Sequence, residues 1–405
     1  MQTLRELYKI GRGPSSSHTI GPERAIKAMK ERFPKAEKFT VTLYGSLAMT
    51  GKGHATDEVI IKTAEPLECE VVFDIQTPCD RHPNTMDIEV TEDGKIVAKQ
   101  RVYSVGGGTV LFEGEKAPDE YCDDVYELNT FSDISDYCKN KNIRLWQYVE
   151  ECEGKEIFYY LDKIWERMKI TVHEGLTCSG TLPGGLDTQR RAQYLYHQRH
   201  IDESMQTREN RLVCSYAFAT SEQNAAGGII VTAPTCGSCG VLPAVLKYMQ
   251  ETRGFSDDAI VKALAAGGII GNIIKRNASI SGAECGCQAE IGTACSMAAA
   301  ALAELFEMGL DQIEYAAEVA MEHHLGLTCD PIGGLVQIPC IERNAVAAMR
   351  AINALSLADF LADSRKVSFD TVVETMYQTG KDLLGSYRET ASGGLATHYK
   401  RKHSL

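Results

Sequence analysis

The sequence predicts an α+β fold in which a small N-terminal α/β domain is followed by a larger all-helical domain. Its 405 residues are enough for two domains that each bury a core. Residues 1–112 mix strands of period two with a short helix. From about residue 134 to the C-terminus, apolar residues recur at helical spacing. We therefore expect an α/β domain over residues 1–150 and an all-helical catalytic domain over residues 151–405.

The elements of the first domain follow from local patterns. Residues 20–33 predict a helix with a proline near its start, where a missing N–H costs little. Residues 39–44 alternate as a half-buried strand does, and residues 67–75 are a second strand candidate. Residues 87–90 and 95–105 flank Thr-Glu-Asp-Gly, which predicts a hairpin.

The second domain begins where the periodicity changes. The junction is either the acidic, polar stretch 113–133 or the loop near Gly154. The first long helix presents one apolar face. The residues of that face are Ile157, Tyr160, Leu161, Ile164, Trp165 and Met168.

Composition excludes several classes of protein. A net charge of −13 without a basic stripe argues against nucleic-acid binding. No apolar run is long enough to span a membrane, since residues 259–274 are interrupted by Lys262 and a glycine pair. Fourteen cysteines without a signal peptide favour a reducing compartment over a disulfide framework. We expect a cytoplasmic protein without nucleic-acid or membrane partners, and a homodimer.

Cysteines in turn-forming settings dominate residues 277–344. Cys287 follows a glycine, Cys329 precedes Asp-Pro, and Cys340 follows a proline. Loops between helices can direct such thiols to one point, which suits a metal or iron–sulfur centre. Cys295 lies inside an alanine-rich helix, where a small buried hydrophobic residue is the simpler interpretation.

The motif at residues 13–19, Gly-Pro-Ser-Ser-Ser-His-Thr, precedes a predicted helix. It offers the hydroxyl groups of Ser15, Ser16, Ser17 and Thr19 and the imidazole of His18. Backbone N–H groups at a helix start bind carboxylate or phosphate well. The alternative is a helix cap with a surface histidine.

His54 follows a strand in the glycine-rich loop at residues 45–57. Its ordinary pKa suits proton abstraction near neutral pH, although a lone histidine is more often structural. The glycines at residues 104–108 lack the spacing of a nucleotide fingerprint.

Two further turns lie in the helical half. Pro183, Gly184 and Gly185 form a rigid turn that can offer backbone groups to a ligand. Cys236 and Cys239 form a C-x-x-C pair, which could bind metal, do redox chemistry or simply be two thiols at a tight helix start. There is no second pair at zinc-finger spacing, so a structural zinc site is not expected.

Taken in order over nearly the whole chain, these motifs resemble the iron–sulfur-dependent L-serine dehydratases (L-serine ammonia-lyases), in the form that fuses both parts in one chain. The resemblance rests on GPSSSHT at 13–19, LYGSLAMTGKGH at 43–54, SVGGG at 104–108, LPGGL at 182–186, APTCGSCGVLPA at 233–244, SISGAECGCQAEIG at 279–292, HHLGLTCDP at 323–331 and LVQIPCIERN at 335–344.

The resemblance implies a [4Fe–4S] cluster held by Cys287, Cys329 and Cys340, with one iron open to substrate. It implies His54 as the base, with His18 and the adjacent serines in the substrate pocket. The iron would act as a Lewis acid while L-serine loses water to give aminoacrylate, and then pyruvate and ammonia.

This sequence departs from the family pattern in two places. In some members a C-terminal cysteine reaches back to the open iron, but this chain ends in His-Ser-Leu. Cys285 stands two residues before Cys287, which retains the Gly-Cys-Gln context of the first ligand.

Other functions remain open at this point. A related lyase could act on L-threonine or L-cysteine. Pyridoxal phosphate catalysis needs a Schiff-base lysine, for which only Lys52 is a candidate, and it leaves three loop cysteines unexplained. An iron–sulfur redox sensor would leave the histidine loop unexplained.

Overall fold

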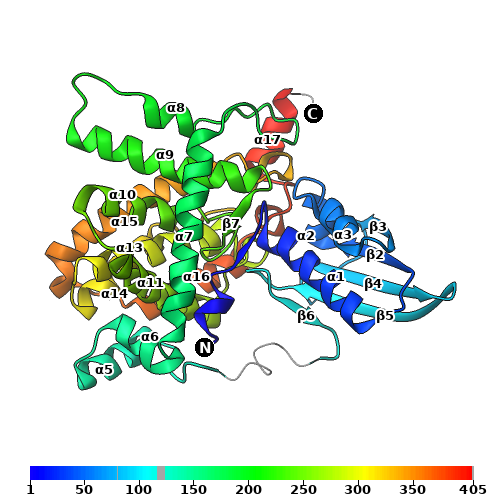
Figure 1. Ribbon diagram of the computed structural model, residues 1–405, viewed down its shortest axis with the longest axis horizontal. Coiled ribbons are helices and arrows are strands. Elements are labelled where there is room, and N and C mark those ends of the chain that lie inside the picture. Colours follow the sequence, from blue (N-terminus) through cyan, green and yellow to red (C-terminus); the bar gives the residue numbers. More distant parts are fainter. Residues whose placement is uncertain (80, 116–123, 404–405) are drawn as a thin grey trace.

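The computed structural model describes residues 1–79, 81–115 and 124–403, and it contains a small part built on a sheet and a larger helical part (Figure 1). The sheet lies in the N-terminal third of the sequence, and the long helices follow it. The predicted α+β fold is therefore confirmed.

The larger sheet has five strands in the order β3-β2-β4-β5-β6. Strands β2 and β3 are parallel, and the other neighbouring pairs are antiparallel. The strands are β2 (Lys38–Tyr44), β3 (Glu68–Asp74), β4 (Thr85–Glu92), β5 (Lys95–Ser104) and β6 (Val110–Phe112). The β4–β5 hairpin turns at Asp93 and Gly94, as the sequence predicts.

Two helices, α1 (Gly21–Arg32) and α3 (Thr56–Ala64), pack on each other and against the sheet (Figure 1). Alternate residues of β2 are fully buried in the same cluster as apolar residues of both helices. The period-two pattern at residues 39–44 therefore arises because only one face of the strand contributes to the core. Between β2 and α3, α2 (Gly45–Thr50) leads into the loop that carries His54.

The helical part is organised around α13 (Thr293–Leu305), every residue of which is buried. Its neighbours are α10 (Val241–Arg253), α11 (Asp257–Asn277), α14 (Leu310–Glu322) and α15 (Cys340–Leu361). The remaining helices of this part are α5 (Phe131–Lys141), α6 (Leu145–Glu153), α7 (Glu156–Thr177), α8 (Ala192–His197), α9 (Met205–Ala225), α12 (Gly282–Cys285), α16 (Phe369–Asp382) and α17 (Gly394–His403).

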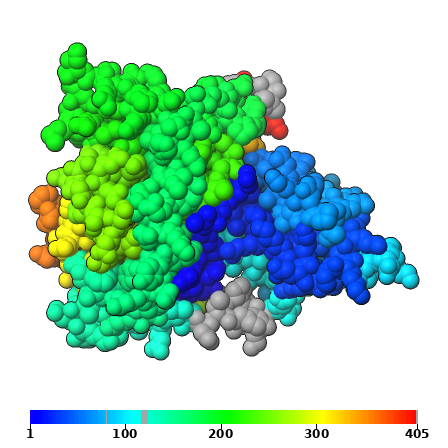
Figure 2. Space-filling model, viewed as in Figure 1, coloured from blue at the N-terminus to red at the C-terminus, as the bar shows by residue number. Residues whose placement is uncertain are grey.

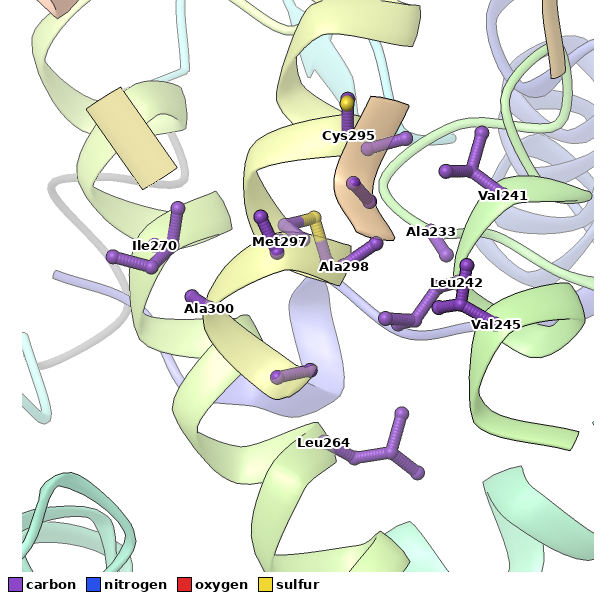
Figure 3. Packing of buried hydrophobic residues seen from close by; sticks show 14 of the residues in the cluster. Ala233, Val241, Leu242, Val245, Leu264, Ile270, Cys295, Met297, Ala298 and Ala300 are labelled. Carbon is purple, nitrogen blue, oxygen red and sulfur yellow. The ribbon is translucent and has the colours of Figure 1, made fainter. Parts of the chain in front are cut away.

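Small residues let these helices approach closely. A methyl group on Gly267 of α11 would lie 2.7 Å from the backbone oxygen of Met297, so only glycine fits there. Figure 3 shows Met297, Ala298 and Cys295 of α13 among the apolar side chains of its neighbours. Cys295 is fully buried, and its thiol donates to the backbone oxygen of Ala347 at 3.2 Å, as expected for a small core residue.

The first residues of the chain belong to the helical part. The strand β1 (Ile10–Arg12) pairs antiparallel with β7 (Ile229–Val231), and the hydroxyl of Tyr8 donates to the backbone oxygen of Leu264 at 2.9 Å. Figure 2 shows this segment, in dark blue, crossing the surface from the helical part to the sheet-containing part. The strands β1 and β7 could not be predicted from the sequence, because each has only three residues, which are too few to show a period.

The chain passes from one hydrophobic core to the other between Phe112 and Tyr126. Phe112 belongs to the cluster under the sheet, whereas Tyr126 and the apolar residues of α5 and α6 belong to the helical cluster. This position lies near the first of the two expected junctions. The division into domains at residue 150 stays a proposal.

Among the described residues, one helical segment is both long enough and apolar enough to cross a membrane. Residues Cys340–Ser364 have a mean hydropathy of 1.4, whereas no such run was expected from the sequence. The alanine-rich side of this segment packs against α9 and α13. Its apolar composition therefore has an explanation in helix packing.

Candidate active site

A turn at the start of α1 holds the serine motif. Ser16–Ile20 form one turn of π-helix, and the Ser15 hydroxyl accepts a hydrogen bond from the backbone N–H of His18 at 3.1 Å. The backbone N–H groups of Ser16 and Ser17 have no partner among the residues that the structure describes. All five candidate residues of the turn are buried, so the alternative of a surface histidine is wrong.

The surrounding hydroxyl groups define the tautomer of His18. Its Nε2 lies 3.2 Å from Ser46 Oγ and 3.0 Å from Thr50 Oγ1. Both hydroxyls donate to backbone oxygens, Ser46 to that of Glu389 at 2.7 Å and Thr50 to that of Ser46 at 3.0 Å. Nε2 is therefore the N–H donor, and Nδ1 accepts from Ser17 Oγ at 3.0 Å.

His54 has the opposite tautomer. Its Nδ1 lies 3.0 Å from the backbone oxygen of Thr50, which can only accept, so Nδ1 carries the proton. Its Nε2 is buried and has no hydrogen-bond partner in the described part of the chain. Burial lowers the pKa of His54 to about 4. Near neutral pH, His54 is thus a neutral imidazole with a free lone pair on Nε2.

The two histidine rings lie side by side, with centroids 4.4 Å apart and planes at 39°. Burial, and then the charge of His54, hold the pKa of His18 well below its usual range. The hydroxyl of Thr19 donates to the backbone oxygen of His54 at 2.9 Å. The serine turn and the histidine loop are therefore fixed to each other.

A carboxylate that sequence analysis missed completes this group. Oε1 of Glu389 lies 3.7 Å from Nδ1 of His18 and 3.9 Å from Nε2 of His54. The chain after α16 returns to Cys329, whose N–H donates to the oxygen of Tyr387 and whose oxygen accepts from the N–H of Glu389, both at 2.8 Å. Burial, and then neighbouring acidic groups, raise the pKa of Glu389 well above its usual range.

The predicted cysteine ligands are linked to the histidines through Glu389, whose N–H donates to the oxygen of Cys329. Cys287 stands in the turn after α12, Cys329 in the loop after α14, and Cys340 at the first position of α15. The Sγ atoms of Cys287 and Cys329 and a carboxylate oxygen of Glu290 all lie within 4.8 Å of one another. Cys340 is outside this closest group, but its thiol interacts electrostatically with Cys287.

The donors in this group fit an iron–sulfur centre. Thiolates select soft metals and iron–sulfur clusters. A methyl group on Gly282 would lie 2.7 Å from Oε2 of Glu290 and 3.2 Å from Sγ of Cys329. Glycine at this position therefore leaves space directly beside the donor atoms.

Arg343 supports the cysteine group from α15. It donates to the backbone oxygen of Thr328 at 2.6 Å and lies 3.4 Å from Oδ1 of Asp330. The pKa of Cys287 is lowered to about 6. The largest cause is a hydrogen bond from the Cys329 thiol; burial opposes this shift, and the charge of Arg343 adds to it. The surroundings of Cys287 favour its thiolate.

The C-x-x-C pair packs beside the site and is not part of the closest metal-binding group. Cys236 and Cys239 are buried with two isoleucines, and the N–H of Cys239 donates to the oxygen of Cys236 at 3.2 Å. The preceding Thr235 donates to Oε1 of Glu290 at 2.7 Å. This arrangement agrees with two thiols in a tight turn before α10.

Three further polar groups, which were not predicted from the sequence, are buried without hydrogen-bond partners in the described part of the chain. His82 Nδ1 accepts from the N–H of Asn84 at 3.0 Å, and its Nε2 lies 3.9 Å from Oε1 of Glu284. Nε2 of His82, Oδ1 of Asn84 and Oγ of Ser281 are buried without a hydrogen-bond partner in the described residues. His82 also acts electrostatically on His18.

The turn at residues 183–185 lies at the wall of a neighbouring cavity. This cavity of about 390 Å³ is lined by Thr19, Gly53, Pro183 and Gly184, among others, while Gly185 and the three serines are not part of its lining. The oxygen of Pro183 accepts from the side-chain amide of Gln337 at 2.6 Å. Because both histidine rings are fully buried, a ligand in the cavity reaches them only after the intervening loops move.

The buried imidazole of His324 should make the free energy of unfolding depend on pH. Its Nδ1 lies 2.7 Å from the oxygen of Ala320, and burial lowers its pKa to about 4. As the pH falls from 6.5 to 4, the unfolded chain binds a proton that the folded protein does not, so stability is lost at a slope of up to about 1.4 kcal/mol per pH unit. His324→Gln should remove this contribution.

The measurement is urea unfolding of both proteins at pH 7, 6 and 5. The difference in free energy of unfolding between wild type and His324→Gln should shrink as the pH falls. A difference that is independent of pH would show that the pKa of His324 is the same in the folded and unfolded states.

Known protein families match nearly the whole chain. The serine dehydratase beta chain family matches residues 3–70, and the serine dehydratase alpha chain family matches residues 67–396. The chain therefore belongs to the serine dehydratase family, with both parts fused in one polypeptide, which confirms the resemblance seen in the motifs.

Individual relatives match over almost their entire length. The chain is 39% identical to an L-serine dehydratase of Haemophilus influenzae over 449 aligned residues, covering 98% of this chain and 99% of the relative. Identity is 38% to L-serine dehydratase 1 of Escherichia coli, covering 98% and 99%. It is 40% to an L-serine dehydratase of Streptomyces coelicolor, covering 97% and 98%.

Proposed function

We propose that this chain is an L-serine ammonia-lyase that dehydrates L-serine to aminoacrylate and so gives pyruvate and ammonia. The observation that carries the proposal is Nε2 of His54, a buried, unprotonated nitrogen without a hydrogen-bond partner in the described residues, 3.9 Å from the carboxylate of Glu389, whose backbone N–H bonds to Cys329. The names of the relatives support L-serine as the substrate.

We assign a [4Fe–4S] cluster to Cys287, Cys329 and Cys340. When bound, a cluster with three cysteine ligands supplies a Lewis acid for the hydroxyl group that leaves. The support for this assignment is the set of donors and the space that Gly282 leaves beside them.

His54 would remove the α-proton of serine. The hydrogen bond from its Nδ1 to the backbone oxygen of Thr50 orients the ring and leaves Nε2 free to accept. Its low pKa keeps the imidazole neutral at physiological pH, although it also makes the nitrogen a weaker base. The neighbouring Glu389 would stabilise the imidazolium that forms.

The serine turn would hold the substrate carboxylate. The backbone N–H groups of Ser16 and Ser17 point out of a helix start, where the helix dipole also favours an anion. The hydroxyl of Ser15 accepts from the backbone N–H of His18, and the hydroxyl of Thr19 accepts from the N–H of Ser15 and donates to the oxygen of His54, which holds this turn in place. The turn at Pro183–Gly185 would form the opposite wall.

The direct test is an anaerobic preparation assayed for pyruvate formation from L-serine. We expect brown protein absorbing near about 400 nm, inactivation in air, and recovery with iron and a reductant. Comparison of kcat/KM for L-serine, L-threonine and L-cysteine identifies the preferred substrate. Full activity in metal-free protein contradicts the cluster assignment, and absence of turnover on all three amino acids favours a redox sensor. A cytoplasmic homodimer remains a proposal.

Gly53→Ala gives a second test of the site, through the loop that carries His54. A methyl group on Gly53 would lie 2.7 Å from the backbone oxygen of Gly334. The loop must then shift, and a displacement of about 1 Å costs about 10²-fold in rate. We expect this loss in kcat/KM for serine, with an unchanged circular dichroism spectrum.

Gly309→Ala is the matched control for this substitution, because its methyl group would meet nothing closer than 3.7 Å. It should retain wild-type activity. If Gly53→Ala is as active as Gly309→Ala, the contact between the histidine loop and Gly334 is not needed for catalysis.

A further inference from the structure

The carboxylate of Glu389 is buried without a hydrogen-bond donor. The residue is 6% exposed, and no hydrogen bond to either carboxylate oxygen occurs within the described ranges. The ring nitrogens that approach it, Nδ1 of His18 and Nε2 of His54, are both acceptors in the tautomers set by Ser17 and Thr50. Nδ1 of His18 already accepts from Ser17, so the acceptors without a donor among the described residues are Nε2 of His54, which is buried, and the neighbouring carboxyl oxygens of Glu389.

The backbone at Glu389 has an unfavourable conformation. Glu389 has φ of +56°, a left-handed conformation that is unfavourable for residues other than glycine, asparagine and aspartate. Hydrogen bonds at both of its backbone groups maintain it: its oxygen accepts from Ser46 at 2.7 Å, and its N–H donates to the oxygen of Cys329 at 2.8 Å. Strain of this kind persists where the surrounding structure imposes it, which is common at binding sites.

We propose that Glu389 binds the α-ammonium group of the substrate, an inference that rests on the proposed function. A primary ammonium supplies three N–H donors and a positive charge, which are what the group of acceptors lacks. The α-carbon is one bond from this nitrogen. An ammonium on Oε1 of Glu389 therefore puts the α-proton beside Nε2 of His54, 3.9 Å from the same oxygen.

This assignment makes Glu389 a determinant of specificity. A carboxylate paired with an ammonium selects α-amino acids over hydroxy acids of the same shape, because a hydroxyl group in place of the ammonium gives the carboxylate no cationic partner. The competing explanation is that Glu389 acts only on the histidine rings, in which case the amino group of a ligand should not affect its contribution to binding.

The experiment compares L-alanine with L-lactate, which differ in having an ammonium or a hydroxyl group on the α-carbon and which both lack the β-hydroxyl. Their affinities are measured by calorimetry on the anaerobically reconstituted enzyme, for wild type, Glu389→Gln and the exposed control Glu374→Gln. We expect Glu389→Gln to weaken L-alanine binding by about 10- to 100-fold, which is typical for a hydrogen bond to a charged group, and to leave L-lactate binding unchanged or tighter. Glu374→Gln should resemble wild type.

A second variant, Glu389→Asn, suits the left-handed backbone and should show the same loss. An unchanged ratio of L-alanine to L-lactate affinity in both variants overturns the assignment of Glu389, even if the enzyme turns over serine. Failure of the wild-type enzyme to turn over serine instead overturns the proposed function. Cluster absorbance and circular dichroism establish that each variant is folded and loaded.

Discussion

His54→Ala is expected to lower kcat for L-serine by about 10²–10⁴-fold, the usual contribution of a general base. The variant should keep the absorption of the cluster, because the hydrogen bonds of His54 are made with Thr50 and Thr19, and neither of these residues is a predicted cluster ligand. It should also stop exchange of the α-deuteron of labelled serine with water. Cluster retention combined with loss of exchange identifies a proton-transfer role.

Two other histidines serve as comparisons. His173→Ala, on the exposed side of α7, should behave as wild type. His18→Ala should raise KM more than it lowers kcat, because a lost binding contact affects the ground state and the transition state alike. If His54→Ala turns over at near wild-type kcat, the base is another residue, and His18 is the first candidate.

Serine substitutions at Cys287, Cys329 and Cys340 should each abolish cluster binding, with iron content, brown colour and activity lost together. A hydroxyl group is a poor replacement for a thiolate as a ligand of iron. The control is Cys295→Ala, which removes a thiol from the core of α13 and should leave iron content and activity in place. Iron analysis and absorption of anaerobic protein measure the effect.

The outcome for Cys340 is the most informative of these. Its thiol lies outside the closest group of donors, in which a carboxylate oxygen of Glu290 lies with the thiols of Cys287 and Cys329 within 4.8 Å. If Cys340→Ser still binds a full cluster, the third ligand is another residue, and Glu290 is the first to test. Loss of the cluster in Cys340→Ser together with its retention in Glu290→Gln supports the three cysteines.

The fold could be predicted where periodicity extended over enough residues. The helix at residues 20–33, the strand at 39–44 and the hairpin at 87–105 appear close to their expected places, because one buried face imposes a pattern on each. The pairing of β1 with β7 could not be predicted, since the two strands have three residues each and are far apart in sequence. Tertiary contacts rather than local pattern define them.

The candidate site could be predicted where motifs combine unusual residues. The rings of His18 and His54 lie together, and the thiols of Cys287 and Cys329 lie within 4.8 Å of each other, whereas the roles assigned to these residues stay predictions. Glu389 was missed because it is one of 55 acidic residues, and nothing in its local sequence marks it as buried. Its position depends on the backbone bridge between Cys329 and Arg388, which is a property of the folded chain.

The order in which the ribosome makes this chain bears on when the site can form. The strand Ile10–Arg12 has no partner until Ile229–Val231 has been synthesised, and Glu389 emerges after the histidines and all three predicted cysteine ligands. A nascent chain can therefore fold its N-terminal sheet early but cannot assemble the histidines, thiols and carboxylate into one unit. Products of interrupted translation that stop before residue 389 would retain the cysteines but lack that carboxylate, so activity begins only after residue 389 has been synthesised.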